Sequence, residues 1–287
     1  MELPPHVSGV RRFFKVFLNR PVVVFGAIVI IVLLVCAAFP EWIAPYDPIK
    51  QDLKSVLLQP SSQHLLGTDA LGRDLVSRII FGARTAVMVG VVALSIAAVS
   101  GMILGLTAGY FGGIAHAIIM RFIDALMAFP VLLLALAIAA LLGGGLLNVM
   151  IAIGIGMMSG YARVMCGQAI SVRENDYVLS AHSSGASNMR IMFRHVLPNC
   201  FPPMIVMMTM MIGMTILFEA GLSFLGIGIK EPTIAWGSLV NDGYKYLLSH
   251  PLLSVAPGIA IILVVYAFNM VGDGLRDTID PRLRGTF

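Results

Sequence analysis

The segment from Thr85 to Met120 contains no Asp, Glu, Lys or Arg. One membrane-spanning helix needs only about 20 mostly apolar residues, so this run is long enough to cross a bilayer. A soluble domain carries about 25% charged residues, whereas this chain of 287 residues has 12% charged and 58% hydrophobic residues. So few charges cannot cover a water-facing surface. Composition therefore excludes a soluble enzyme, a disordered chain and a nucleic-acid-binding module, and it predicts an integral membrane protein.

Other uncharged runs give the number of spans. The run from Ala125 to Ala162 is interrupted by Gly143-Gly144-Gly145, which predicts two helices joined by a tight hairpin. The runs are too long for barrel strands and do not alternate. We therefore expect an all-α protein whose six membrane spans lie near 21–40, 85–108, 118–142, 146–165, 200–222 and 252–272.

The first run follows a basic arm formed by Arg11, Arg12, Lys15 and Arg20. A signal peptide is the alternative interpretation, but the apolar run is longer than the core of such peptides. We interpret it as an uncleaved anchor helix. The positive-inside rule then places both termini on the cytoplasmic side, because this arm and most later arginines fall on that side.

The chain lacks the motifs that carry common chemistry. It has no GxxxxGK[ST] phosphate loop, no HExxH and no GxSxG. The three cysteines, Cys36, Cys166 and Cys200, form no CxxC and are expected to be free thiols. Few carboxylates are expected near the membrane interior, and Asp124 and Glu219 are the main candidates. We predict no catalytic residue, no metal site and no cofactor on this chain, and hence one subunit of a larger assembly.

The polar segment 173–199 between the fourth and fifth spans is the most informative. Its pattern predicts two short helices separated by Gly185 and ended by Pro198 before the fifth span. One interpretation is an interfacial amphipathic helix that anchors the loop. The other is a rigid element that docks into a partner protein.

This segment resembles the EAA loop of ABC-importer permeases, which has the pattern Glu-Ala-Ala, three residues, Gly, nine residues, Ile, one residue, Leu-Pro. Leu179-Ser180-Ala181 stands where Glu-Ala-Ala is expected, and Gly185, Leu197 and Pro198 match the spacing. His195 occupies the Ile position, and Leu179 replaces the acid.

The resemblance covers most of the chain and is closest to the C-type subunits of dipeptide, oligopeptide and nickel permeases. The motifs that carry it include Leu66–Asp69, Leu71–Asp74, Ala108–Gly113, Ala128–Pro130, Asp176–Val178, Leu222–Gly226, Trp236-Gly237, Gly272–Asp277 and Asp280–Leu283.

The resemblance implies a five-span permease core, residues 85–287, preceded by an arm, anchor helix and external segment, residues 1–84. It implies a second, similar permease, two cytoplasmic ATPases that bind ATP and Mg, and an extracytoplasmic binding protein, all at a bacterial or archaeal cytoplasmic membrane. It also implies import of peptides by alternating access, with nickel or a metal chelate as the alternative cargo. The residues implied in coupling to the ATPases are Leu179, Ser180, Ala181, His182, Gly185, Ala186, Arg190, Arg194, Leu197 and Pro198.

Other residues allow both a functional and a structural interpretation. Glu219, Met207, Met211 and Met214 in the fifth span would line a pathway or gate, or would pack the core. The methionines surround the helix, which disfavours a soft-metal ladder.

Outside the membrane, four charged residues form either a docking surface for the binding protein or an internally paired segment: Arg73, Asp74, Arg78 and Arg84. Asp124 is expected to pair with Arg121 one turn away. The glycines at 101, 105, 109 and 113 predict a close helix–helix seam, static or sliding.

A self-contained secondary carrier or channel is the rival class, and a structural scaffold is a third. The segment 173–199 discriminates between them, because a carrier or a scaffold needs no element for docking ATPases.

Overall fold

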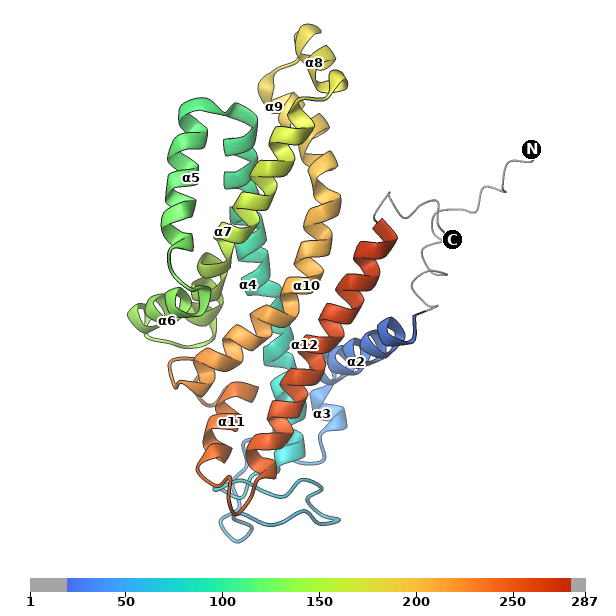
Figure 1. Ribbon diagram of the computed structural model, residues 1–287. Coiled ribbons are helices and arrows are strands. Elements are labelled where there is room, and N and C mark those ends of the chain that lie inside the picture. Colours follow the sequence, from blue (N-terminus) through green and yellow to red (C-terminus); the bar gives the residue numbers. More distant parts are fainter. Residues whose placement is uncertain (1–19, 280–287) are drawn as a thin grey trace, which may run out of the picture.

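The computed structural model describes residues 20–279, and its regular elements in that range are helices (Figure 1). The predicted all-α class is therefore confirmed. Parts of the predicted inner surface, namely Arg11, Arg12, Lys15 and the motif at 280–283, lie outside the described residues. Within residues 20–279, five helices are long and apolar enough to cross a membrane. They are α2 (Pro21–Ala38), α4 (Leu75–Phe111), α7 (Leu146–Arg173), α10 (Leu197–Phe224) and α12 (Leu252–Ile279).

The third predicted span, 118–142, is not one straight helix. It consists of α5 (Gly113–Met127) and α6 (Val131–Leu142), which are bent by 90°. The break falls at Ala128-Phe129-Pro130, because proline restricts the residue before it and donates no backbone hydrogen bond. The count of six spans holds when this bent pair is counted as one.

The hairpin after α6 is confirmed. Gly143, Gly144 and Gly145 all have positive φ, at 87°, 71° and 90°, a conformation that favours glycine. The backbone N–H of Gly145 donates to the carbonyl of Gly228, 3.1 Å away. The hairpin is thereby fastened to the loop that follows α10.

Helix α4 begins at Leu75, ten residues earlier than the sequence predicts. The Asp74 side chain caps it by accepting a 2.8 Å hydrogen bond from the backbone N–H of Ser77. The first three turns carry Arg78 and Arg84, although charged residues predict that this part lies outside the span. At 37 residues, α4 runs from the external segment at one end of the bundle to the top of the neighbouring α5 at the other (Figure 1).

The glycine seam on α4 faces α7. A Cβ at Gly101, Gly105 or Gly109 would lie 2.5, 2.2 or 2.6 Å from a carbonyl oxygen of α7, far inside contact distance. The two backbones therefore touch directly, as small residues permit. Gly113 is not part of the seam, because it lies past the end of α4 and its Cβ would meet nothing within 4 Å.

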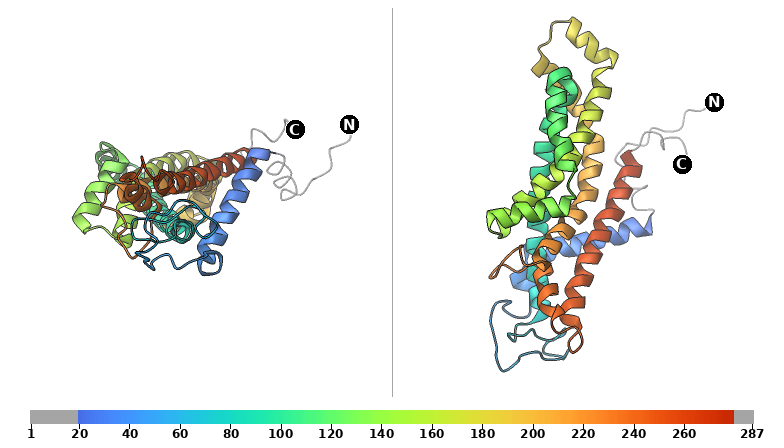
Figure 2. Two further views of the ribbon diagram at one scale, coloured as in Figure 1. Left: turned by 90° about the horizontal axis from the view of Figure 1, so that it is seen from below. Right: turned by 60° about the vertical axis from the view of Figure 1, so that its left-hand side comes forward.

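Helices α2 and α12 lie side by side in both views (Figures 1 and 2). Arg20, before the first turn of α2, forms an ion pair with Asp277 near the end of α12. Both ends of the described chain therefore lie on one side, as the N-in, C-in orientation requires. Segment 44–74 and the short helix α11 (Trp236–Tyr244) occupy one end of the bundle, and segment 174–196 occupies the other.

Candidate functional site

The segment that follows α7 projects from the end of the bundle (Figure 1). It contains α8 (Asp176–Ser183), α9 (Asn188–Ile191) and a π-helical turn, η1 (Met192–Val196), that leads into α10. Between α8 and α9 the chain turns at Gly185, whose φ is +78°. The predicted pair of short helices around Gly185 is therefore observed.

Pro198 does not end this segment, contrary to the prediction. It lies in the first turn of α10, and helical structure continues from Asn188 to Phe224. Because the residues before it are already helical, Pro198 leaves a carbonyl of the preceding turn without its usual backbone donor. The π-helical turn just before it joins α9 to α10 without a loop.

The segment has a buried face and an exposed apolar face. Val178, Ile191, Met192 and Val196 are buried against the bundle. Four large apolar side chains of the segment are exposed to between 44% and 57%, and we call them together the coupling face: Tyr177, Leu179, Met189 and Phe193. Isolated exposed apolar residues are ordinary, but four on one projecting segment are typical of a surface that binds a protein or lies at the membrane interface.

The predicted coupling residues lie on or beside this face. Leu179, Ser180, His182, Gly185, Arg190, Arg194 and Pro198 are exposed, whereas Ala181, Ala186 and Leu197 are partly buried. The exposed arginines make the surroundings basic. The structure thus gathers these residues at one end of the molecule, while their contact with an ATPase stays a prediction.

A cavity of about 450 Å³ lies between the end of α4 and α8. Its lining includes Tyr110 and Phe111 of α4, Arg173 of α7, and Leu179 and His182 of α8. Arg173 Nη1 donates to the carbonyl oxygens of Gly109 and Tyr110, at 3.2 and 3.0 Å. These carbonyls belong to the last turn of α4, where a cation is favoured by the helix dipole.

At the opposite end, an ion-pair network fastens the external segment to the bundle. Arg73 donates from Nε to Asp69 Oδ2 and from Nη1 to Glu231 Oε1, each at 2.6 Å. Arg78 Nη2 donates to the same Glu231 oxygen at 3.3 Å. Burial acts to raise the pKa of Glu231, but the hydrogen bonds and charges of the two arginines hold it below its ordinary value.

This network changes the interpretation of the predicted docking residues. Arg73 is 6% exposed, Arg78 is 3% exposed and Asp74 is also buried. Asp74 accepts hydrogen bonds from Ser77 and pairs with His64 at 2.9 Å. These three side chains therefore hold the external surface together instead of presenting themselves on it. Docking of a binding protein on that surface stays a prediction.

Arg84 joins a different pair of elements. It donates to both carboxylate oxygens of Glu41, at 2.7 and 3.1 Å, and to the carbonyls of Ala37 and Ala38 at the end of α2. The hydrogen bonds from Arg84 lower the pKa of Glu41. Arg84 is the most exposed of the four predicted docking residues.

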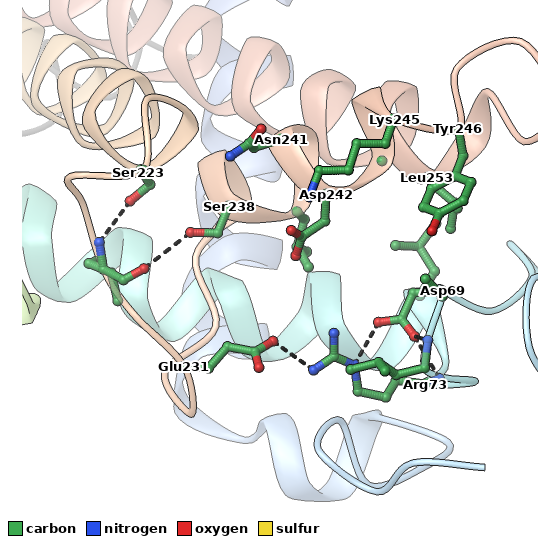
Figure 3. A pocket seen from close by; sticks show the side chains of 17 residues that line it. Asp69, Arg73, Ser223, Glu231, Ser238, Asn241, Asp242, Lys245, Tyr246 and Leu253 are labelled. Carbon is green, nitrogen blue, oxygen red and sulfur yellow. Dashed lines mark hydrogen bonds and ion pairs between the residues drawn. The ribbon is translucent and has the colours of Figure 1, made fainter. Parts of the chain in front are cut away.

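A cavity of about 360 Å³ opens beside the network (Figure 3). Asp69 and Arg73 line it from the external segment, Glu231 from the loop after α10, and Asp242 and Lys245 from α11 and its C-terminal end. Burial raises the pKa of the Asp242 carboxyl and outweighs the nearby Arg78. The cavity carries both charge signs, so it suits a polar group better than an apolar one.

The side chains of the predicted pathway residues are less exposed to solvent than a pathway lining predicts. Glu219 is 1% exposed, and its Oε1 accepts a 2.6 Å hydrogen bond from Ser223 Oγ, which lines the outer cavity. Met207 and Met211 are partly buried and pack against the main core, and Met214 is also partly buried. Core packing accounts for the two methionines that contact the core, and a pathway role stays a prediction.

Asp124 pairs with Arg163 of α7 and not with the predicted Arg121. A helical neighbour three residues away is within reach, but α5 packs along α7 and offers a partner across the interface. Among residues 20–279, no group of three or more His, Cys, Asp or Glu side chains is arranged to hold a metal.

Sequence reasoning missed Glu231, the residue on which Arg73 and Arg78 converge. It lies 158 residues from Arg73, and no local pattern indicates the pairing. The Asp69–Arg73 spacing of four residues was a usable signal for an internally paired segment.

Comparison with known proteins gives consistent matches. Residues 101–285 match the family described as "Binding-protein-dependent transport system inner membrane component". Residues 8–60 match the "N-terminal TM domain of oligopeptide transport permease C".

Three relatives illustrate the similarity. The chain is 41% identical to the probable D,D-dipeptide transport system permease of Escherichia coli K12, over 93% of this chain and 90% of that protein. It is 40% identical to the di/tripeptide permease of Pseudomonas aeruginosa, over 96% and 93%. It is 39% identical to the glutathione permease of Pectobacterium atrosepticum, over 96% and 91%.

The fold is also similar to a solved structure. A chain from the inward-facing MetNI methionine ABC transporter aligns with a TM-score of 0.57 and 16% identity, covering 70% of this chain and 96% of that one. At this identity the likeness shows the fold alone, which is that of an ABC-importer permease.

Proposed function

The chain belongs to the family of binding-protein-dependent transport system inner membrane components, and we therefore propose that it is the permease subunit of an ATP-driven importer of dipeptides or oligopeptides. ATP hydrolysis takes place on partner chains, and this chain provides part of the transmembrane path. Its site is the cytoplasmic membrane of a bacterium or archaeon.

The coupling face is the observation that carries the proposal. Tyr177, Leu179, Met189 and Phe193 expose apolar area on a segment that projects beyond the bundle. Exposed apolar area in water is unfavourable by roughly 25 cal/mol per Å², so a partner that covers it gains that free energy. We assign this face to the cleft of a cytoplasmic ATPase, whose closure would move the segment and switch the permease by alternating access.

The names of the relatives support peptides as the cargo. The three relatives described above are named for dipeptides, di- and tripeptides, and glutathione. These names lend no support to the nickel alternative. The expected partners are a second, similar permease, two ATPases carrying ATP and Mg, and an extracytoplasmic binding protein.

The outer surface built by segment 44–74 is proposed as the place where the binding protein docks. Its rigidity comes from Arg73, Arg78 and Glu231, and Arg84 lies at its edge. We place the boundary between the anchor unit and the permease core at Leu75, where α4 begins, in place of residue 85.

The proposal is tested by purifying the tagged chain from its native membranes in mild detergent and identifying the recovered chains by mass spectrometry. We expect a second permease and P-loop ATPases in a total of two copies. Leu179→Asp should abolish ATPase recovery and keep the second permease. Leu248→Asp, at an exposed apolar residue of the outer end, is the matched control and should recover both.

Two outcomes would contradict the proposal. Recovery of ATPases with the Leu179→Asp variant at the wild-type level would remove the coupling face from the interface. A chain recovered alone that transports without ATP after reconstitution would favour a secondary carrier or channel.

A further inference from the structure

The coupling segment is residues 176–196, which form α8, α9 and η1. Helix α4 is not adjacent to this segment in the sequence. The segment is joined to α7 through residues 174–175 and to α10 through η1. Movement of the segment therefore pulls directly on α7 and α10. Movement of α7 reaches α4 through the glycine seam and the Arg173 hydrogen bonds, and movement of the segment itself reaches α4 through contacts at the inner end of α4.

One hydrogen bond joins the inner end of α4 directly to the coupling segment. The Tyr110 hydroxyl, in the last turn of α4, donates to Asn188 Oδ1, the first residue of α9, at 3.1 Å. Tyr110 is 6% exposed, whereas Asn188 is exposed, and both residues line the cavity of about 450 Å³. Within residues 20–279, this is the one hydrogen bond that joins α4 to α8, α9 or η1.

The surroundings of this bond are partly open and partly apolar. The cavity of about 450 Å³ lies beside it, between Tyr110 and Phe111 on one side and α8 on the other. Val178, the one buried side chain of α8, belongs to the same apolar core as Tyr110, together with Ile191 and Met192. The hydrogen bond therefore adds a directional polar contact to this apolar packing.

We propose that the Tyr110–Asn188 hydrogen bond transmits movement of the coupling segment to α4, so that α4 and α7 respond to the ATPases as one unit. Tyr110 and Asn188 are positioning residues in this proposal, because they act by joining α4 to α9. Arg173 assists by holding the last carbonyls of α4 against the end of α7. The inference rests on the proposed function and adds to it a route inside the chain.

The test is hydrogen–deuterium exchange of the native complex in lipid nanodiscs, with and without ATP plus orthovanadate. In the wild type, nucleotide trapping should alter exchange in segment 176–196 and in 104–111 at the end of α4. Tyr110→Phe removes the donor and keeps the ring. It should preserve the change in the coupling segment and reduce the change in α4 by roughly two- to tenfold, the size expected for one hydrogen bond.

Three further variants separate transmission from simple loosening. Asn188→Asp retains an acceptor oxygen and should keep the response of α4, whereas Asn188→Leu should lose it and add nothing in the Y110F background. Tyr244→Phe removes an exposed hydroxyl of α11, at the opposite end of the bundle, and is the matched control.

The possible results are distinguishable. An unchanged α4 response in both Y110F and N188L would overturn the inference while leaving the importer assignment intact. Absence of any nucleotide response in the wild-type complex would overturn the proposed function, and the inference with it.

Discussion

Arg73 and Glu231 stand 158 residues apart in the sequence, yet Nη1 of the arginine lies 2.6 Å from Oε1 of the glutamate. Arg78 reaches the same oxygen, and Asp69 completes the network. The external segment is therefore attached to the loop after α10 by a contact that excludes most solvent from the guanidinium groups but leaves the Glu231 side chain more than half exposed.

Glu231→Gln should loosen the external segment without unfolding the helices. Since the carboxylate is partly screened by water, we expect a loss of roughly 1 kcal/mol, or about fivefold faster local opening. The measurement is the rate of trypsin cleavage after Lys50 and Lys54 in the purified protein. Glu41→Gln, which weakens an exposed ion pair with Arg84, is the control and should leave that rate unchanged; equal rates for all three proteins would contradict the assigned role.

The same network gives a dependence on pH. The folded protein holds the pKa of Glu231 below the ordinary value of 4.5. A carboxyl with a lowered pKa contributes stability above the unfolded pKa and loses it as pH falls through the folded pKa. Protection from a protease active in acid, such as pepsin, should therefore decline as pH falls below 4.5, and the decline should be shallower for Glu231→Gln. An identical acid profile for the two proteins would exclude Glu231 as its source.

Gly185 should tolerate asparagine and reject valine. A Cβ at this position meets nothing within 4 Å, so the constraint is its φ of +78° and not the space around it. Left-handed conformation costs ordinary residues roughly 1–2 kcal/mol, less for Asn and more for β-branched residues. We expect Gly185→Val to reduce uptake of labelled dialanine at least tenfold with normal membrane insertion, and Gly185→Asn to retain most of it.

The control is Gly167→Ala, on an exposed helical position with nothing within 4 Å of a Cβ, which should transport normally. If valine at 185 transported as well as asparagine, the turn would have no mechanical importance.

Gly105→Ala should destabilise the α4–α7 seam. Its Cβ would lie 2.2 Å from the carbonyl oxygen of Ala162, and neither backbone can move without separating the helices. Overpacking of this kind costs about 1–3 kcal/mol. Thermal unfolding in detergent, followed by size-exclusion chromatography, should show a lower midpoint than for Gly258→Ala, where a Cβ meets nothing within 4 Å. Equal midpoints would mean that the seam is loosely packed.

The helices were predictable because lipid exposure forces long uncharged runs. The first span, predicted at 21–40, is observed as Pro21–Ala38. The start of α4 was placed ten residues late because Arg78 and Arg84 were counted as loop charges, while in the structure their guanidinium groups bind carbonyls and carboxylates from other segments. Hydropathy alone does not contain that information.

The candidate site was predictable in part for a similar reason. Gly185 and the apolar residues around it are a local pattern, so the two short helices and the turn between them could be anticipated, whereas the end predicted at Pro198 was wrong. The pairing of Asp124 with Arg163, the burial of Arg73 and the hydrogen bond from Tyr110 to Asn188 depend on which helices are neighbours. Such long-range contacts follow from packing, and one sequence does not specify it.

Helix α4 has 37 residues, and at 1.5 Å per residue it is about 55 Å long. The hydrocarbon layer of a bilayer is about 30 Å thick, so roughly 25 Å of the helix stands outside it. Its first turns contain Arg78 and its last turn contains Tyr110. Where α4 lies backbone to backbone against α7, few side chains separate the two helices. Few rotamer changes at this contact could therefore absorb a displacement of one helix against the other. One continuous helix therefore joins the external surface to the cytoplasmic junction, so that a tilt of α4 moves both ends.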